Sequence, residues 1–69
     1  MSIGTNIREI RKGQNLRQVD LAAKAKVEQV YISNIENNRF NDPGVFRVKR
    51  IAAALNCSIE RLLEGVENE

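Results

Sequence analysis

Apolar residues recur along this chain at the spacing of helices. Ile3, Ile7 and Ile10 follow one another at intervals of four and three residues, which places them on one face of a first helix. Ser2 is suited to cap the start of this helix. Similar patterns predict helices over residues 18–25, 29–37 and 45–55, and Ser58 is suited to begin a short fifth helix. No segment shows the alternation of apolar and polar residues that is typical of a strand. The pattern therefore predicts a compact all-α fold with five short helices.

Turn-forming residues separate the predicted helices. Gly13 and Asn15 follow the first one, and Asn tolerates the left-handed conformation that ends a helix. Residues 36–44, ENNRFNDPG, contain three Asn, one Asp, Pro and Gly, which is typical of a loop. A chain of 69 residues has room for one domain. We expect this domain over residues 1–66, followed by a frayed acidic tail at residues 67–69.

Chemistry-bearing residues are scarce in this composition. The chain has no His and a single Cys, Cys57, so we expect no metal site, no disulfide and no cofactor. Without a His, a Ser or Cys beside an evident base, or a Gly-rich phosphate loop, we expect no enzyme. No apolar run approaches the roughly 20 residues that span a bilayer. We therefore expect a soluble cytoplasmic protein with no membrane partner.

The charge is unevenly distributed along the chain. Residues 1–59 carry ten Lys and Arg against five acids, a net charge of +5, whereas residues 60–69 carry one Arg against four Glu, a net charge of −3. A basic body predicts a polyanionic partner such as nucleic acid, and an ordinary solvated basic surface is the alternative.

The join between the second and third predicted helices narrows the choice of fold. Only about three residues separate residues 18–25 from residues 29–37, so these two helices must cross steeply, at about 90–120°. Such a crossing needs a small residue where the backbones approach, and Ala22 supplies it. It also needs apolar residues that seal the angle, and these are Leu21, Val27, Ile32 and Ile35.

This join, followed by ENNR and by RIAAALNCSIERLLEG, resembles the lambda-repressor-like helix-turn-helix family of the Cro and phage-repressor kind. The resemblance extends from Ile3 to Gly65. The matching residues are Gln18, Leu21, Ala22, Val27, Ile32, Ser33, Ile35, Glu36, Pro43, Ile51, Ala52, Ala54, Leu55, Ser58, Leu62, Leu63 and Gly65.

The resemblance implies a transcriptional regulator, a repressor in the first instance, that binds double-stranded DNA sequence-specifically. It further implies a homodimer on a palindromic operator, in a bacterial or phage-encoded, nucleoid-associated protein. Four residues depart from the family pattern, and one of them is Asn38, which replaces a common Gly. Lys26 occupies the turn position that is usually Gly, Arg17 stands where Thr or Ser often caps the second helix, and Glu28 holds the cap position of the third, where its carboxylate is able to accept a backbone N–H.

In this family the third helix lies in the major groove, so its outward residues are the expected readers of base edges. They are Gln29, Val30, Ser33 and Asn34. Gln and Asn match the donor and acceptor pair of adenine, and an exposed Val suits a thymine methyl group. The alternative is that the polar residues are merely solvated and that Val30 is half-buried.

The resemblance also suggests contacts to DNA phosphates, which position the protein without specifying sequence. The expected phosphate contacts are Arg17, Gln18, Lys26, Tyr31, Arg39 and Asn41. For the charged residues the alternative is a solvated charge, and for Tyr31 it is a partly buried core ring.

Two further contacts are expected from the resemblance and from helix geometry. Arg11 and Glu36 should form a structural ion pair between the first and third helices. The dimer contact is expected on the fifth helix through Ile59 and Leu62, with Cys57 nearby and Arg61 against an acid across the axis, while Leu55 and Leu63 serve the interior. A protein-interaction module, an antitoxin and a restriction–modification controller are alternative roles for the same bundle.

Overall fold

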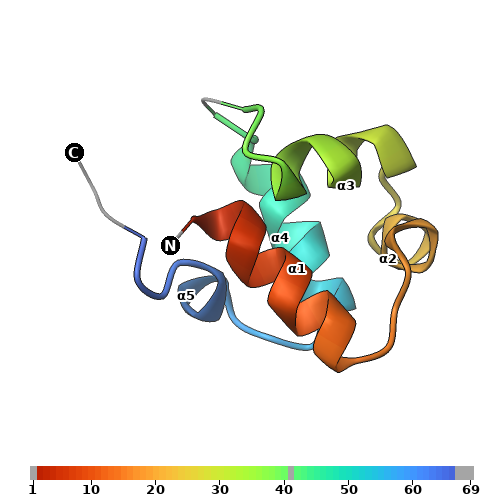
Figure 1. The fold of residues 1–69 in the computed structure, drawn as a ribbon, viewed down its shortest axis with the longest axis horizontal. Helices are drawn as coiled ribbons and strands as arrows, with labels where there is room; N and C mark the ends of the chain where they lie inside the picture. Colours follow the sequence, from red (N-terminus) through yellow and green to blue (C-terminus); the bar gives the residue numbers. More distant parts are fainter. Residues whose placement is uncertain (1, 41, 67–69) are drawn as a thin grey trace.

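The computed structural model describes residues 2–40 and 42–66, and in this part of the chain all regular structure is helical (Figure 1). The expected all-α fold class is confirmed, and each predicted helix is present. The helices are α1 (Ile3–Gly13), α2 (Gln18–Ala25), α3 (Gln29–Glu36), α4 (Val45–Ala54) and α5 (Ile59–Leu62). The predicted tail at residues 67–69 lies outside the described residues.

Serine side chains begin the first and last helices, as the sequence predicts. Ser2 Oγ accepts the backbone N–H of Thr5 at 3.1 Å, and Ser58 Oγ accepts that of Arg61 at 3.1 Å. Each bond satisfies one of the N–H groups that a helix start leaves without an intrahelical acceptor.

The helices α2, α3 and α4 have no such side-chain cap. The Glu28 side chain makes no capping hydrogen bond to α3, so its carboxylate does not take the capping role that was open to it. At the start of α2, Asp20 Oδ2 accepts the backbone N–H of Arg17 at 2.9 Å, which is the half of a capping box that needs no hydroxyl at the first position.

Left-handed residues end several helices. Asn15, Asn38 and Asn56 have φ angles of 59°, 58° and 56°, a conformation that Asn tolerates better than most residues. Lys26 shares this conformation at the end of α2, with φ 57° and ψ 45°, at the position that is usually Gly in the resembling family. The short turn from α2 into α3 is therefore built on a strained, non-glycine residue.

The core lies where the helices converge. Figure 1 shows α2 and α3 at one end of the molecule and α5 at the other, and α1 packs on both α3 and α5. The largest fully buried apolar side chains come from all five helices or their caps: Ile7, Leu21, Ile32, Ile51, Leu55 and Leu62. This set anchors the α2–α3 pair to the rest of the domain.

An ion pair and a backbone contact join α1 to α3. Arg11 Nε and Nη2 donate to the two carboxylate oxygens of Glu36 at 2.7 and 2.9 Å, so the predicted pair is present and two-pronged. At the other end of α1, a Cβ added to Gly4 would stand 1.9 Å from the carbonyl oxygen of Ile35. Only Gly allows the two helices to approach this closely.

Asn6 ties α1 to the end of the chain. Its Nδ2 donates to the carbonyl oxygens of Leu62 and Glu64, both at 2.8 Å, while its Oδ1 is buried without a partner in the described structure. The amide therefore fixes where α5 docks, because these two carbonyls lie at the point where α5 ends.

Candidate nucleic-acid interface

The helix α3 has two distinct faces. Ile32 and Ile35 are buried against α1 and α2, at 0% and 2% exposure. Gln29 is exposed, Val30 is 59% exposed, and Ser33 and Asn34 are half-buried on the other side. Within residues 2–40 and 42–66, no hydrogen bond engages the side chains of Gln29 or Asn34. The outward face therefore carries unoccupied amide donors and acceptors beside an exposed Val.

The turn before α3 sets the position of this face. The backbone N–H of Lys26 donates to the carbonyl oxygens of Ala22 and Ala23. That of Val27 donates to the carbonyl oxygen of Ala22 at 3.0 Å. The small side chain of Ala22, which is 4% exposed, leaves room for this return. The chain thus leaves α2 and enters α3 within three residues, as the steep crossing requires.

Tyr31, an expected phosphate contact, is buried and its hydroxyl is bonded within the chain. Its hydroxyl donates to the carbonyl oxygen of Pro43 at 2.6 Å, and the residue is 7% exposed. A phenol has one proton to donate, and this proton already has an acceptor. Burial raises the pKa of the hydroxyl, while the nearby charges of Arg47 and Arg50 act to lower it. The structure therefore favours the alternative of a buried core ring for Tyr31.

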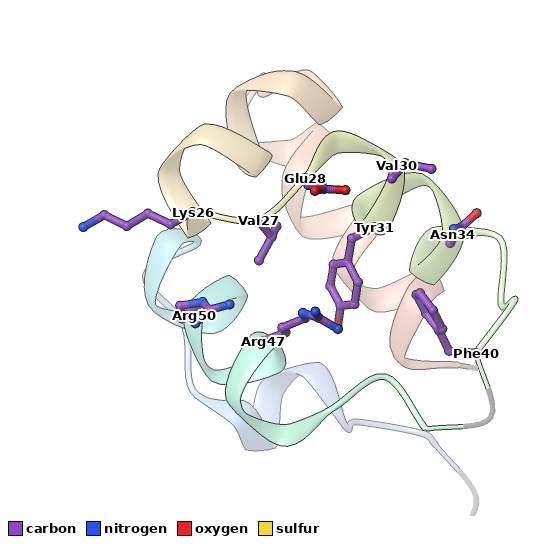
Figure 2. A pocket seen from close by; sticks show the side chains of 9 residues that line it. All are labelled: Lys26, Val27, Glu28, Val30, Tyr31, Asn34, Phe40, Arg47 and Arg50. Atoms are coloured by element: carbon purple, nitrogen blue, oxygen red, sulfur yellow. The ribbon is translucent and has the colours of Figure 1, made fainter.

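A hollow of about 470 Å³ lies beside α3, between the α2–α3 turn and the start of α4 (Figure 2). Its lining includes the outward residues Val30 and Asn34 and the rings of Tyr31 and Phe40, whose centroids are 5.2 Å apart. The full lining is Lys26, Val27, Glu28, Val30, Tyr31, Asn34, Phe40, Arg47 and Arg50. The hollow is thus continuous with the outward face of α3.

Two of the cations at this hollow, Arg47 and Arg50, were absent from the expected site. The guanidinium carbon of Arg47 lies 5.2 Å from the centroid of the Tyr31 ring, within the range of a cation–π contact. Figure 2 shows the Arg47 side chain reaching toward that ring from α4. Their spacing of three residues on a predicted helix indicated a shared face, but nothing in the sequence showed that this face turns toward α3.

Four of the other expected phosphate contacts lie at the start of α2 or in the chain on either side of α3. Arg17 is exposed at the start of α2, where its guanidinium binds Asp20 at 3.0 and 3.1 Å, and this contact raises the pKa of Arg17. Gln18 Nε2 donates to Glu36 at 3.1 Å. Lys26 and Arg39 are exposed beyond the two ends of α3. Asn41 lies outside the described residues.

The apolar face of α5 differs from the sequence prediction. Leu62 is fully buried and belongs to the core of the chain itself, so the expectation that it forms a dimer contact was wrong. Leu63, expected in the interior, is 47% exposed. Ile59 and Cys57 are half-buried against the core, and burial raises the pKa of the Cys57 thiol. Arg61 Nη1 lies 3.4 Å from Glu64 Oε2, so Arg61 forms an ion pair within its own chain.

Neither a membrane-spanning helix nor a metal-binding cluster is found in the part of the chain that the structure describes. No helix there has the length and apolar composition needed to cross a bilayer. No group of three or more His, Cys, Asp or Glu side chains is arranged to hold a metal ion.

The steep α2–α3 pair with its polar outward face defines a helix-turn-helix protein. The sequence pattern of the helix-turn-helix family matches residues 7–62, and the chain belongs to that family. The family expected from the sequence is thereby confirmed.

Known relatives support the same family. The chain is 35% identical over 63 residues to the immunity repressor protein of Bacillus phage phi105, covering 91% of this chain and 43% of the relative. It is 34% identical over 62 residues to the transcriptional regulator SinR of Bacillus subtilis, covering 90% of this chain and 56% of the relative. The chain therefore spans about half the length of these curated relatives.

A solved structure shows the same arrangement of helices. A crystal structure of SinR, described as the master regulator for biofilm formation and determined in complex with DNA, superposes with a TM-score of 0.84. The two chains are 34% identical, and the match covers 88% of this chain and 97% of the SinR chain.

Proposed function

We propose that this chain binds double-stranded DNA sequence-specifically and acts as the DNA-binding unit of a transcriptional repressor. The observation that carries the proposal is the outward face of α3, where unoccupied amides stand beside an exposed Val. The similarity to a phage immunity repressor and to the SinR chain bound to DNA supports both the ligand and the regulatory role. Since these relatives come from a bacterium and a phage, we place the activity in the bacterial cytoplasm.

The proposed reading head is the outward face of α3 inserted in the major groove. Gln29 and Asn34 have free amides that match the acceptor N7 and donor N6 of adenine. Val30 offers an apolar contact to a thymine methyl group, and Ser33 a hydroxyl that bonds either donors or acceptors. Gln18, Lys26 and Arg39 border this face and would contact phosphates, which fix the register of the helix on the duplex.

A homodimer on a palindromic operator fits the size of the module. Single modules of this size bury little DNA surface, whereas two modules about one helical turn apart combine their affinities. We place the two-fold contact on α5, with Leu63 as the apolar anchor in place of Leu62. Ile59, Cys57 and Arg61 would surround it.

Selection of bound sites from a random duplex pool tests this function. We expect a palindromic consensus, and we expect Gln29→Ala to weaken the best site by about 1–3 kcal/mol and to relax preference at one base pair in each half-site. Arg39→Ala is the control, because a phosphate contact should weaken all sequences alike.

Two outcomes would contradict the proposal in different ways. If both variants lose affinity with an unchanged consensus, α3 is not the reading helix. If the parent chain shows no salt-dependent affinity for any duplex, the bundle is a protein-interaction module. SinR has also been solved in complex with the SinI protein, so protein partners occur among the relatives.

A further inference from the structure

We propose that Arg47 and Arg50 of α4 form a phosphate-binding wall of the DNA interface, and that Tyr31 is a positioning residue that holds Arg47 in place. This inference rests on the proposed function, since it names residues of the same interface. It adds two residues of α4 to the phosphate contacts proposed above, and it gives Tyr31 an indirect role in place of a direct contact.

The hollow lies next to the outward face of α3, which is proposed to enter the major groove. Val30 and Asn34 belong both to the outward face of α3 and to the hollow, so a duplex that engages this face also approaches the hollow. A major groove about 12 Å wide receives a helix of about 10–12 Å with its side chains, so phosphate strands must pass close along both flanks of α3. The hollow lies on the α4 flank, where Arg47 and Arg50 form the far side (Figure 2).

The hollow carries more positive than negative charge. Its ionisable cations are Lys26, Arg47 and Arg50, and Glu28 is the single carboxylate in the lining. Within residues 2–40 and 42–66, the ion pairs engage other arginines, Arg11, Arg17 and Arg61. Within the described residues, the guanidinium groups of Arg47 and Arg50 are in no ion pair, so they can bind an anion without breaking one. Arg17, in contrast, must first leave Asp20.

The Tyr31 ring is held in place by its neighbours and lies beneath Arg47. The ring is held at its hydroxyl by the Pro43 carbonyl, at 2.6 Å, and on its side by Phe40. Arg47 lies over this fixed ring, so its long side chain has fewer conformations to lose when it binds a phosphate. Tyr31 thereby acts through Arg47 and does not bind phosphate itself, because its hydroxyl proton is donated to the Pro43 carbonyl.

The salt dependence of DNA binding by the intact chain tests the wall. The variants are Arg47→Gln and Arg50→Gln, with Lys49→Gln as a matched control, because Lys49 is an exposed cation on α4 that does not line the hollow. We expect each arginine variant to lower the slope of log K against log salt by about 0.9 in magnitude. Equivalently, the loss of affinity between about 50 and 200 mM salt becomes about three- to four-fold smaller. The control should keep the parental slope.

A second pair of variants tests the positioning role. Tyr31→Leu removes the ring under Arg47, so we expect it to flatten the salt slope in the parent and to leave the slope unchanged in an Arg47→Gln background. A merely structural role for Tyr31 would lower affinity by the same factor in both backgrounds and would leave both slopes intact, which overturns this part. Helical content by circular dichroism confirms that each variant is folded at the temperature of the assay.

The outcomes separate the inference from the function on which it rests. A parent chain that binds DNA while Arg47→Gln, Arg50→Gln and Lys49→Gln give one common slope overturns the wall and leaves the proposed function standing. A parent chain without affinity for any duplex overturns the proposed function itself.

Discussion

Removing Arg11 should test whether the ion pair with Glu36 determines the stability of the fold. The Arg11 side chain is 9% exposed and that of Glu36 is 2% exposed, so both charges are held away from water. Arg11 Nη1 also donates to the carbonyl of Leu16 at 2.8 Å, and Glu36 Oε1 accepts from Gln18. In the variant Arg11→Met, the stem keeps its packing while these guanidinium contacts are lost.

The expected magnitude follows from the burial of the remaining charge. Glu36 would keep one amide donor from Gln18, which does not replace a two-pronged guanidinium. Breaking one side of a buried pair costs about 3–5 kcal/mol, since the other charge is left uncompensated. A domain of 69 residues has a total stability of roughly 3–10 kcal/mol. The variant should therefore unfold wholly or melt at least about 12 °C lower than the parent.

Urea and thermal denaturation followed by circular dichroism would measure this loss. The double variant Arg11→Met with Glu36→Leu is the matched control, because replacing a whole buried pair by apolar residues is often neutral or stabilising. We expect it to recover most of the stability that the single variant loses. A single variant that melts like the parent, or a double variant as unstable as the single one, would refute the reasoning.

Three other changes test separate features of the fold and the interface. Gly4→Ala should destabilise the domain strongly because the new Cβ meets the Ile35 carbonyl, while Gly13→Ala, with nothing within 4 Å, should be neutral or stabilising; equal melting temperatures would contradict this close approach. Lys26→Gly should raise stability by up to about 1 kcal/mol in urea melts through relief of its left-handed strain, and Lys26→Ala, which keeps the strain, should not. Leu63→Glu should remain folded yet lose cooperative binding to a palindrome in gel-shift assays, whereas Leu62→Glu should not fold; unchanged cooperativity in the folded variant would place the dimer contact elsewhere.

Most of the helix boundaries were predictable because local chemistry sets them. Ser2 and Ser58 cap helices in the structure as expected, and the left-handed Asn residues end them where the sequence placed turns. The Arg11–Glu36 pair followed from the family resemblance. For the caps and turns, the residue type itself determines the local conformation, so tertiary packing has little to change.

The sequence was a poorer guide where tertiary packing decides which side of a helix is buried or which group a side chain contacts. A helix of four residues shows too little periodicity to distinguish Leu62 from Leu63, and the docking of α5 through Asn6 decides which of them is buried. The bond from the Tyr31 hydroxyl was not predictable, because its acceptor, the Pro43 carbonyl, lies in a loop whose path the sequence does not show. Arg47 and Arg50 were missed for a similar reason, since the orientation of α4 against α3 determines what they face.

The Asn6 bridge has a consequence for the order in which the chain folds. Its two hydrogen bonds join residues 56 and 58 positions apart in sequence, whereas the Arg11–Glu36 pair spans 25. Because α5 is a single turn of four residues and its docking closes these longer loops, we expect it to dock after α1 to α4 have assembled and to open first in native-state hydrogen exchange. If two chains associate through α5, each partner would hold closed the segment that opens most readily. Operator binding would then protect the domain against local unfolding far from the DNA.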